Sequence, residues 1–196
     1  SDPQRRPRAF SGPGLVILPA GVEGDLYYLY PKTTETSSSA LCSLLPCSDQ
    51  TTIKDIAGGT AVTVVRISAA QAAELKPQRS LAARLGDGLE LTGYDLTHQL
   101  EPGQPVLLTV YGRFIEPALD FGDWHFYAHL VEPGASEALS AADSPVKVGR
   151  LQPGDGFALR LSLPTAHTLS AGDYEVQVGL AGHAEDELSL GLTHVN

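Results

Sequence analysis

The sequence of 196 residues has no methionine, two cysteines and few aromatic residues, which make up 7% of the chain. It also lacks any apolar run near the roughly 18 residues that a membrane-spanning helix needs. Lys and Arg number 13 against 23 Asp and Glu, a net charge of −10 that repels nucleic acid and anionic membrane surfaces. We therefore expect no nucleic-acid partner and no direct membrane insertion by this chain. Because Met is absent even at position 1, and no signal-peptide apolar region follows, we expect a piece of a longer protein.

The two cysteines, Cys42 and Cys47, enclose four residues of which the last is Pro46. A zinc site needs four ligands, and neither a second Cys pair nor a close His pair accompanies them, so we predict no metal site here. In an oxidising compartment this spacing, bent by Pro46, allows a local disulfide. In a reducing compartment the same pair would remain two inert thiols.

Catalytic motifs are missing as well. The sequence has no nucleophile elbow, no phosphate-binding loop and no His-Glu-x-x-His pair, and Gly86-Asp87-Gly88 fits a turn better than a dinucleotide fingerprint. We predict neither a catalytic residue nor a cofactor for this chain. A hydrolase that uses His129 with Asp123 or Asp95 is the enzymatic alternative, but no nucleophile motif accompanies these residues.

The first part of the chain is irregular in composition. Residues 1–13 are rich in Pro, Gly and Arg and predict a flexible leader. Residues 14–79 combine short apolar runs with a Ser/Thr-rich stretch at 32–52, which we interpret as a long loop. One short helix is predicted at 69–75, with Ser68 as its N-cap. These features predict a small irregular α+β extension.

From residue 80 to residue 196, apolar-rich runs of about seven to ten residues alternate with Pro-Gly and Gly-Asp turns. Strands at this spacing, without long helices between them, are typical of antiparallel pairing. We therefore predict a mostly β fold, with an antiparallel β-sandwich or jelly-roll-like domain over 80–196. The predicted strands are 89–96, 106–115, 124–131, 157–163, 174–180 and 188–194.

Residues 124–130 alternate strictly between the two faces of a strand, with the apolar side chains on one face. On such a strand His125 and His129 lie roughly 13 Å apart, too far to share a metal ion. The period-2 placement on neighbouring runs predicts one shared core. Its expected members are Trp124, Phe126, Leu130, Leu159, Leu161, Val176 and Val178.

Several aromatic and histidine side chains are candidates for ligand binding, because flat amphipathic rings are the surfaces on which sugars stack. The alternative for each is an ordinary place in the core or on a half-buried face. The candidates are Tyr94, Tyr111, His125, Tyr127 and His129. The acidic triplet at 185–187 is interpreted as a solvated hairpin tip, with structural calcium as the alternative.

An ordered series of strand and turn motifs covers residues 84–181. It resembles the extracytoplasmic C-terminal β-domain of bacterial membrane glycosyltransferases akin to the dolichyl-phosphate-mannose protein mannosyltransferase family. Two positions depart from the family pattern: Gly112 stands where an aromatic is usual, and no Trp follows the stretch 142–145. The matching features are Gly86, Asp87, Gly93 and Tyr94 in the first strand; Pro102-Gly103 leading to Tyr111 and Arg113; His129 and Leu130 before Gly134; Pro153-Gly154-Asp155 leading to Pro164; and Gly172 leading to Leu180.

This resemblance implies that the chain is a non-catalytic accessory ectodomain, held on the extracytoplasmic side of the membrane by the transmembrane segments of its parent. The catalytic residues would lie in the membrane half, and the expected partners are that membrane half and a glycan or an acceptor polypeptide. An extracytoplasmic location implies oxidising conditions, in which Cys42 and Cys47 should form a disulfide. A carbohydrate-binding β-sandwich module is the alternative function.

Overall fold

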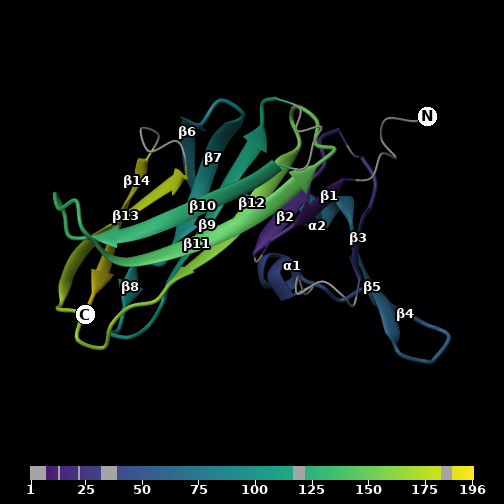
Figure 1. Ribbon diagram of the computed structural model, residues 1–196, viewed down its shortest axis with the longest axis horizontal. Coiled ribbons are helices and arrows are strands. Elements are labelled where there is room, and N and C mark those ends of the chain that lie inside the picture. Colours follow the sequence, from purple (N-terminus) through teal and green to yellow (C-terminus); the bar gives the residue numbers. More distant parts are fainter. Residues whose placement is uncertain (1–7, 13, 22, 32–38, 117–121, 182–186) are drawn as a thin grey trace.

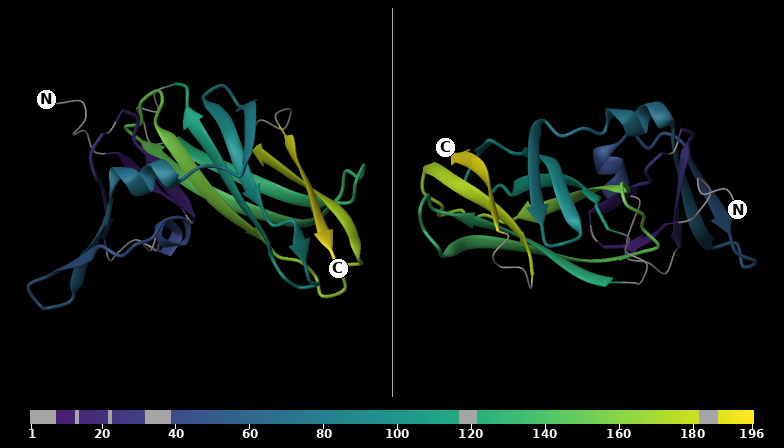
Figure 2. Two further views of the ribbon diagram at one scale, coloured as in Figure 1. Left: turned by 180° about the vertical axis from the view of Figure 1, so that it is seen from behind. Right: turned by 90° about the horizontal axis from the view of Figure 1, so that it is seen from above.

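The computed structural model describes residues 8–12, 14–21, 23–31, 39–116, 122–181 and 187–196. Two sheets lie face to face as a sandwich, and a third, smaller sheet lies at one end (Figures 1 and 2). Among the described residues, every strand pairing is antiparallel except that of β14 (Leu188–Val195) with β8 (Gln99–Leu100). The predicted mostly β sandwich is thus confirmed.

The two sandwich sheets have six and five strands. The six-stranded sheet has the order β1 (Ala9–Ser11), β11 (Ala138–Gly149), β10 (Gly122–Val131), β13 (Gly172–Leu180), β14 (Leu188–Val195) and β8 (Gln99–Leu100). The five-stranded sheet has the order β2 (Leu15–Leu18), β12 (Gly156–Leu163), β9 (Val106–Phe114), β7 (Leu89–Leu96) and β6 (Arg79–Leu85).

The space between these sheets is filled by a continuous apolar core to which both contribute. Phe126 lies at its centre, with its ring centroid 5.7 Å from that of Phe157 in the opposite sheet. The predicted core is confirmed for Phe126 and for all of its predicted leucines and valines. Trp124 is only partly buried and packs at the margin against Phe114. Alternation along the strands therefore identifies most of the predicted members of this core.

Pro-Gly pairs form several turns between the sandwich strands. Gly103, Gly134 and Gly154 have φ values of +84°, +81° and +89°, in the left-handed region where a side chain would be strained. The predicted turn at 86–88 is also present between β6 and β7. The turn at Gly134 joins the antiparallel strands β10 and β11, whereas the turns at Gly103 and Gly154 carry the chain from one sheet of the sandwich to the other.

A small unit, here called the N-terminal subdomain, packs at one end of the sandwich (Figure 1). Helix α2 (Ala69–Glu74) confirms the predicted helix and its cap: Ser68 Oγ accepts from the backbone N–H of Gln71, and the Gln71 side chain accepts from the backbone N–H of Ser68. The unit comprises the sheet β3 (Leu26–Pro31), β5 (Thr60–Ile67) and β4 (Gln50–Lys54), with α1 (Ser39–Leu44) and α2 (Ala69–Glu74).

The prediction of a long loop over 32–52 is wrong for its described part, which contains helix α1 and the start of β4. Residues 32–38 lie outside the described residues. Leu41 and Leu45 supply the reason, because both are buried in one cluster with Tyr28, Tyr30 and Val65 of the subdomain sheet. Apolar residues in a Ser/Thr-rich context are thus enough to anchor a helix once a disulfide and a sheet lie beside it.

The predicted flexible leader over 1–13 also needs correction. Residues 9–11 form strand β1, which pairs with β11. Arg8 forms a double hydrogen bond with Asp155, at 2.6 and 3.1 Å, and both side chains are almost fully buried. Because this partner lies 147 residues away, no local pattern indicates the attachment. Residues 1–7 lie outside the described residues.

Strand β2 joins the subdomain to the sandwich, so the predicted extension over 14–79 is not separate from it. Leu15 and Ile17 point into the sandwich core, while Val16 points into the core of the subdomain. The hydroxyl of Tyr28 on β3 donates to the backbone carbonyl of Ile17 at 2.8 Å. One strand buried on both faces therefore holds the two parts in a fixed arrangement.

Among the described residues, no helix has the length and apolar character needed to cross a membrane.

Candidate functional site

The five candidate ligand-binding residues lie in three different places. Tyr94 faces the sandwich core, where its hydroxyl donates to the carbonyl of Leu190, so its ring has no free face for a ligand. Three of the others, His125, Tyr127 and His129, lie on the outer face of the six-stranded sheet. Tyr111 lies on the outer face of the five-stranded sheet, on the opposite side of the sandwich. The candidates therefore do not form one site.

Strand β10 carries a polar aromatic strip on its outer face. The rings of Tyr127 and His129 are 4.8 Å apart and tilted by 33°, and His129 Nδ1 lies 3.0 Å from a carboxylate oxygen of Glu187. Tyr127 lies across Gly179 on β13, because a Cβ atom there would come within 2.2 Å of the phenol. Two of the three rings of this strip therefore contact each other, and the two histidines lie beside carboxylates from neighbouring segments.

The structure tests the hydrolase and calcium alternatives only where it describes their residues. His129 and Asp95 lie on opposite outer faces of the sandwich, so they do not form a catalytic pair. The side chain of Asp123 and residues 185 and 186 lie outside what the structure describes. Within the described ranges, no group of three or more His, Cys, Asp or Glu residues could hold a metal ion.

A polar pocket of about 350 Å³ opens on the outer face of the five-stranded sheet, where the N-terminal subdomain meets it. Its size falls within the range of roughly 300–1,000 Å³ that is usual for small-molecule sites. We call it the Asp95–Arg160 pocket. It is lined by Ser43, Leu44, Gln78, Asp95, Leu96, Thr97, Leu107, Thr109, Tyr111 and Arg160.

Three lining residues form one row across the sheet. Thr109 on β9 pairs in register with Asp95 on β7 on one side and with Arg160 on β12 on the other. Since neighbouring strands lie about 4.8 Å apart, the backbones of Asp95 and Arg160 are separated by roughly 10 Å. The pocket therefore has a carboxylate on one side of Thr109 and a guanidinium on the other.

A β-bulge in β7 sets this arrangement. The register with β9 shifts between Leu91 and Gly93, so Leu91 and Tyr94 both point into the core. Without the extra residue, strict alternation would place Asp95 on the same face as Leu91. The bulge thus buries Tyr94, a predicted sugar platform, and turns Asp95 outward into the pocket.

The Asp95 carboxylate is fixed by two donors. It accepts from the hydroxyl of Tyr111 at 2.7 Å and from the backbone N–H of Gln78 at 2.6 Å. Burial, together with the hydrogen bond and the negative charge of Asp95, raises the pKa of Tyr111 above its ordinary value. Tyr111 therefore remains a neutral donor that orients the carboxylate.

Arg160 connects the pocket to the subdomain. Its Nη1 donates to the backbone carbonyl of Ser43 at 3.2 Å. No ion pair joins Arg160 to Asp95 in the part of the chain that the structure describes, although both line the same pocket. The remaining guanidinium donors are thus available to a ligand on the pocket side.

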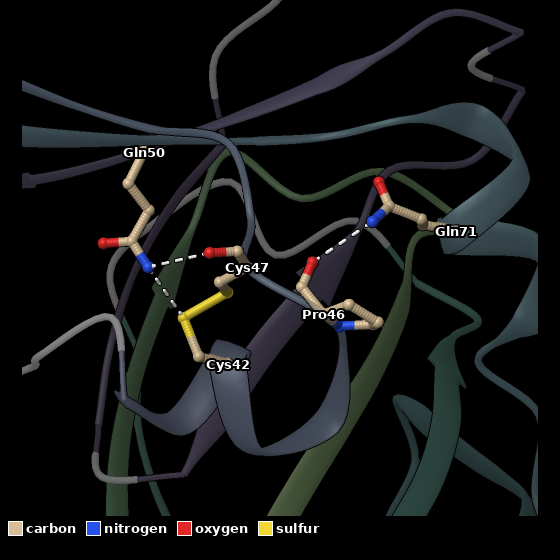
Figure 3. Close-up of a disulfide and its surroundings, with 5 residues drawn as sticks. All are labelled: Cys42, Pro46, Cys47, Gln50 and Gln71. Carbon is tan, nitrogen blue, oxygen red and sulfur yellow. Dashed lines mark hydrogen bonds between the residues drawn. A yellow bond between two sulfur atoms is a disulfide. The ribbon is translucent and has the colours of Figure 1, made fainter.

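A disulfide between Cys42 and Cys47 holds the wall that contains Ser43 and Leu44 (Figure 3). The Cα atoms of the two cysteines are 5.1 Å apart. Gln50 donates to Cys42 Sγ and to the carbonyl of Cys47, and Gln71 of α2 donates to the carbonyl of Pro46. Figure 3 shows both glutamines directed toward this loop, which ties helix α1 to the strand and helix that flank it.

Of the residues that line this pocket, Tyr111 was a ligand-binding candidate from the sequence, whereas Arg160, Thr109 and Ser43 were not. Arg160 is the only charged residue in the run 157–163, and this outward charge in an apolar strand was the available signal. Its proximity to Ser43 depends on how α1 packs, which the sequence pattern does not contain.

No protein-family model matches the sequence, and no curated protein does. Among solved structures, the C-terminal domain of wzt is similar at 20% identity and a TM-score of 0.42, covering 62% of this chain and 82% of that one. The major pilin subunit BcpA of Bacillus cereus is similar at 9% identity and a TM-score of 0.26, covering 96% of this chain and 69% of that one. Both TM-scores are too low to establish a shared fold or function, and what is shown for this chain is a mostly β protein with a sandwich of two sheets.

Proposed function

We propose that this chain is a non-catalytic accessory module that contacts carbohydrate and belongs to a membrane-bound glycosyltransferase-like protein. The observation that carries the proposal is the Asp95–Arg160 pocket. Its lining offers hydroxyl, carboxylate and guanidinium groups beside an aromatic ring. Sugar hydroxyls donate and accept at once, and this mixture of partners satisfies both roles.

The proposal of a glycosyltransferase-like parent protein rests on the sequence motifs that resemble that family. The Pro-Gly turns and strands of the resemblance fall on the turns and strands of the sandwich, in the same order along the chain. A module of this kind, on the extracytoplasmic side, would place a glycan or an acceptor near the membrane half that performs the transfer. The disulfide between Cys42 and Cys47 suits the oxidising conditions of that location.

A glycan array probed with the full chain tests the carbohydrate contact. We expect retention of a limited set of glycans, which a heat-denatured sample does not retain. Absence of binding to every glycan, on the array and in solution at millimolar sugar, would overturn this part of the proposal.

The proposal that this module belongs to a membrane-bound protein is tested separately. The coding sequence upstream of Ser1 should encode a series of apolar membrane-spanning segments. A protease added to intact cells should cleave this module from the cell surface and so remove it from the membrane fraction. A gene without such spans, with glycan binding retained, would favour the second candidate, a carbohydrate-binding module outside a glycosyltransferase.

A further inference from the structure

The Asp95–Arg160 pocket also indicates which class of sugar it accepts, an inference that rests on the proposed carbohydrate contact. We infer that it binds a neutral pyranose residue through adjacent hydroxyl groups, held between the Asp95 carboxylate and the Arg160 guanidinium. The wall at Ser43 and Leu44 closes one side of this site. No catalytic step is part of the inference.

The first argument is geometric. Asp95, Thr109 and Arg160 occupy one row over three neighbouring strands, so the charged groups face one another over a gap of one intervening residue. A six-membered ring can lie in this gap above Thr109 with a hydroxyl directed to each side. The pocket volume of about 350 Å³ suits one such residue rather than a long oligosaccharide enclosed on all sides.

The second argument concerns hydrogen bonds. Tyr111 and Gln78 already donate to Asp95, which fixes the carboxylate oxygens while leaving lone pairs for ligand donors. The Arg160 guanidinium donates one hydrogen bond to the carbonyl of Ser43 and has further N–H groups that can donate to a ligand. A hydroxyl pair, donating to Asp95 and accepting from Arg160, satisfies both groups at the same time.

The third argument is charge. One negative and one positive side chain line the pocket without pairing with each other, so the site has no net charge to favour an ionic ligand. A uronate or a phosphate placed beside Arg160 would also approach the fixed carboxylate of Asp95 and be repelled by it. The protonated amine of a hexosamine would in turn be repelled by the Arg160 guanidinium. The pocket therefore favours an uncharged residue.

The experiment is calorimetric titration of the full chain with methyl glycosides of neutral hexoses, of a uronic acid and of a hexosamine. Hydrogen bonds to charged groups contribute about 1.5–3 kcal/mol, so Asp95→Asn and Arg160→Gln should each weaken binding of the neutral sugar by about tenfold or more. Thr109→Val, which keeps the side-chain volume, should weaken it less.

Matched controls lie on the same sheet face. Glu90 and Arg113 form an exposed ion pair on β7 and β9 and do not line the pocket. Glu90→Gln and Arg113→Gln remove the same charges and should leave binding unchanged. Thermal unfolding of every variant identifies loss of the fold, and Thr109→Val keeps the test valid if Asp95→Asn unfolds.

The other possible results of this titration would each contradict a different statement of the proposal. Stronger binding of the uronic acid, with Asp95→Asn improving it, would overturn the ligand class. Binding of neutral sugars that survives Asp95→Asn, Arg160→Gln and Thr109→Val but is lost in Tyr127→Ala would assign the site to strand β10 and leave the proposed function standing. No binding of any glycan by the unaltered chain would overturn the proposed function itself.

Discussion

The sandwich and the N-terminal subdomain are stabilised in different ways. The sandwich buries side chains from both of its sheets in one continuous core, with Phe126 against Phe157 at the centre. The subdomain has a small core made of Val16, Tyr28, Tyr30, Leu41, Leu45, Val65 and Ile67. It adds a disulfide, a capped helix and a hydrogen bond from Tyr28 to β2.

The comparison shows how a small unit is kept in place beside a large one. A unit of this size buries too little apolar surface to be stable alone, which is why cross-links and shared strands are common in small units. Strand β2 is shared, because its alternate side chains enter the two cores. The pocket lies where the two parts meet, so its shape depends on the smaller part as well as on the sandwich.

The largest expected effect comes from the sandwich core. Phe126→Ala removes a fully buried ring and leaves a cavity, which costs about 3–5 kcal/mol of unfolding free energy. Both parts should unfold together at a lower midpoint, measured by circular dichroism during heating. An unchanged midpoint, or loss of the subdomain alone, would contradict a sandwich that supports the whole chain.

The next effect concerns the attachment of the first strand. Arg8→Met leaves the fully buried Asp155 without its charged partner, although Asp155 still accepts from the backbone N–H groups of Ala20 and Gln152. Loss of a partner from a buried ion pair costs about 3 kcal/mol or more. Hydrogen exchange should accelerate in β1 and in the turn at 152–155. Unaltered exchange at both places would show that Arg8 does not hold this strand.

A smaller and more local effect is expected at the disulfide. Cys42→Ser with Cys47→Ser opens a short loop, whose closure contributes about 2 kcal/mol in the chain-entropy description. Hydrogen exchange should increase over α1 and β4, with little change in the midpoint of the sandwich. The sugar affinity should fall as well, since Ser43 and Leu44 form the pocket wall. A large fall in the global midpoint would show that the sandwich depends on this loop.

The smallest effect at neutral pH is that of Tyr28→Phe, which removes the hydrogen bond to Ile17 and costs about 1 kcal/mol. Burial raises the pKa of Tyr28 and raises that of Tyr30 from 10.0 to about 12. Because the folded subdomain then holds protons that the unfolded chain loses, stability is retained below pH 10 and falls as the pH rises toward 12. Protection factors in β3, which correct the exchange rates for base catalysis of intrinsic exchange, should fall along this pH range, and Tyr28→Phe should reduce the slope. A pH-independent protection factor would contradict the burial of both hydroxyls.

The sequence predicts the sandwich well because its strands alternate and its turns contain Pro-Gly pairs. The subdomain was harder to predict: β4 is exposed along its whole length and shows no alternation, and α1 lies in a Ser/Thr-rich stretch. Helix α1 is held by packing in the subdomain core and by the local disulfide, and β4 is held by its pairing with β5.

The site was predictable only in part. Tyr111 was a candidate, but the bulge between Leu91 and Gly93 moves Tyr94 into the core and Asp95 into the pocket. A bulge changes the face of every later side chain on its strand, and the local alternation of apolar and polar residues does not predict it. Arg160 reaches Ser43 across 117 residues, a proximity that only the folded chain provides.

The most direct test of the account is a nuclear magnetic resonance titration of the isotope-labelled chain with a neutral sugar that it binds. The account predicts shift changes at Asp95, Thr109 and Arg160, joined by Ser43 and Leu44 across the boundary between the two parts. Resonances of His125, Tyr127 and His129 on the opposite face should stay in place. Shift changes confined to that opposite face, or spread over the surface without saturation, would contradict a sugar site between the sandwich and the N-terminal subdomain.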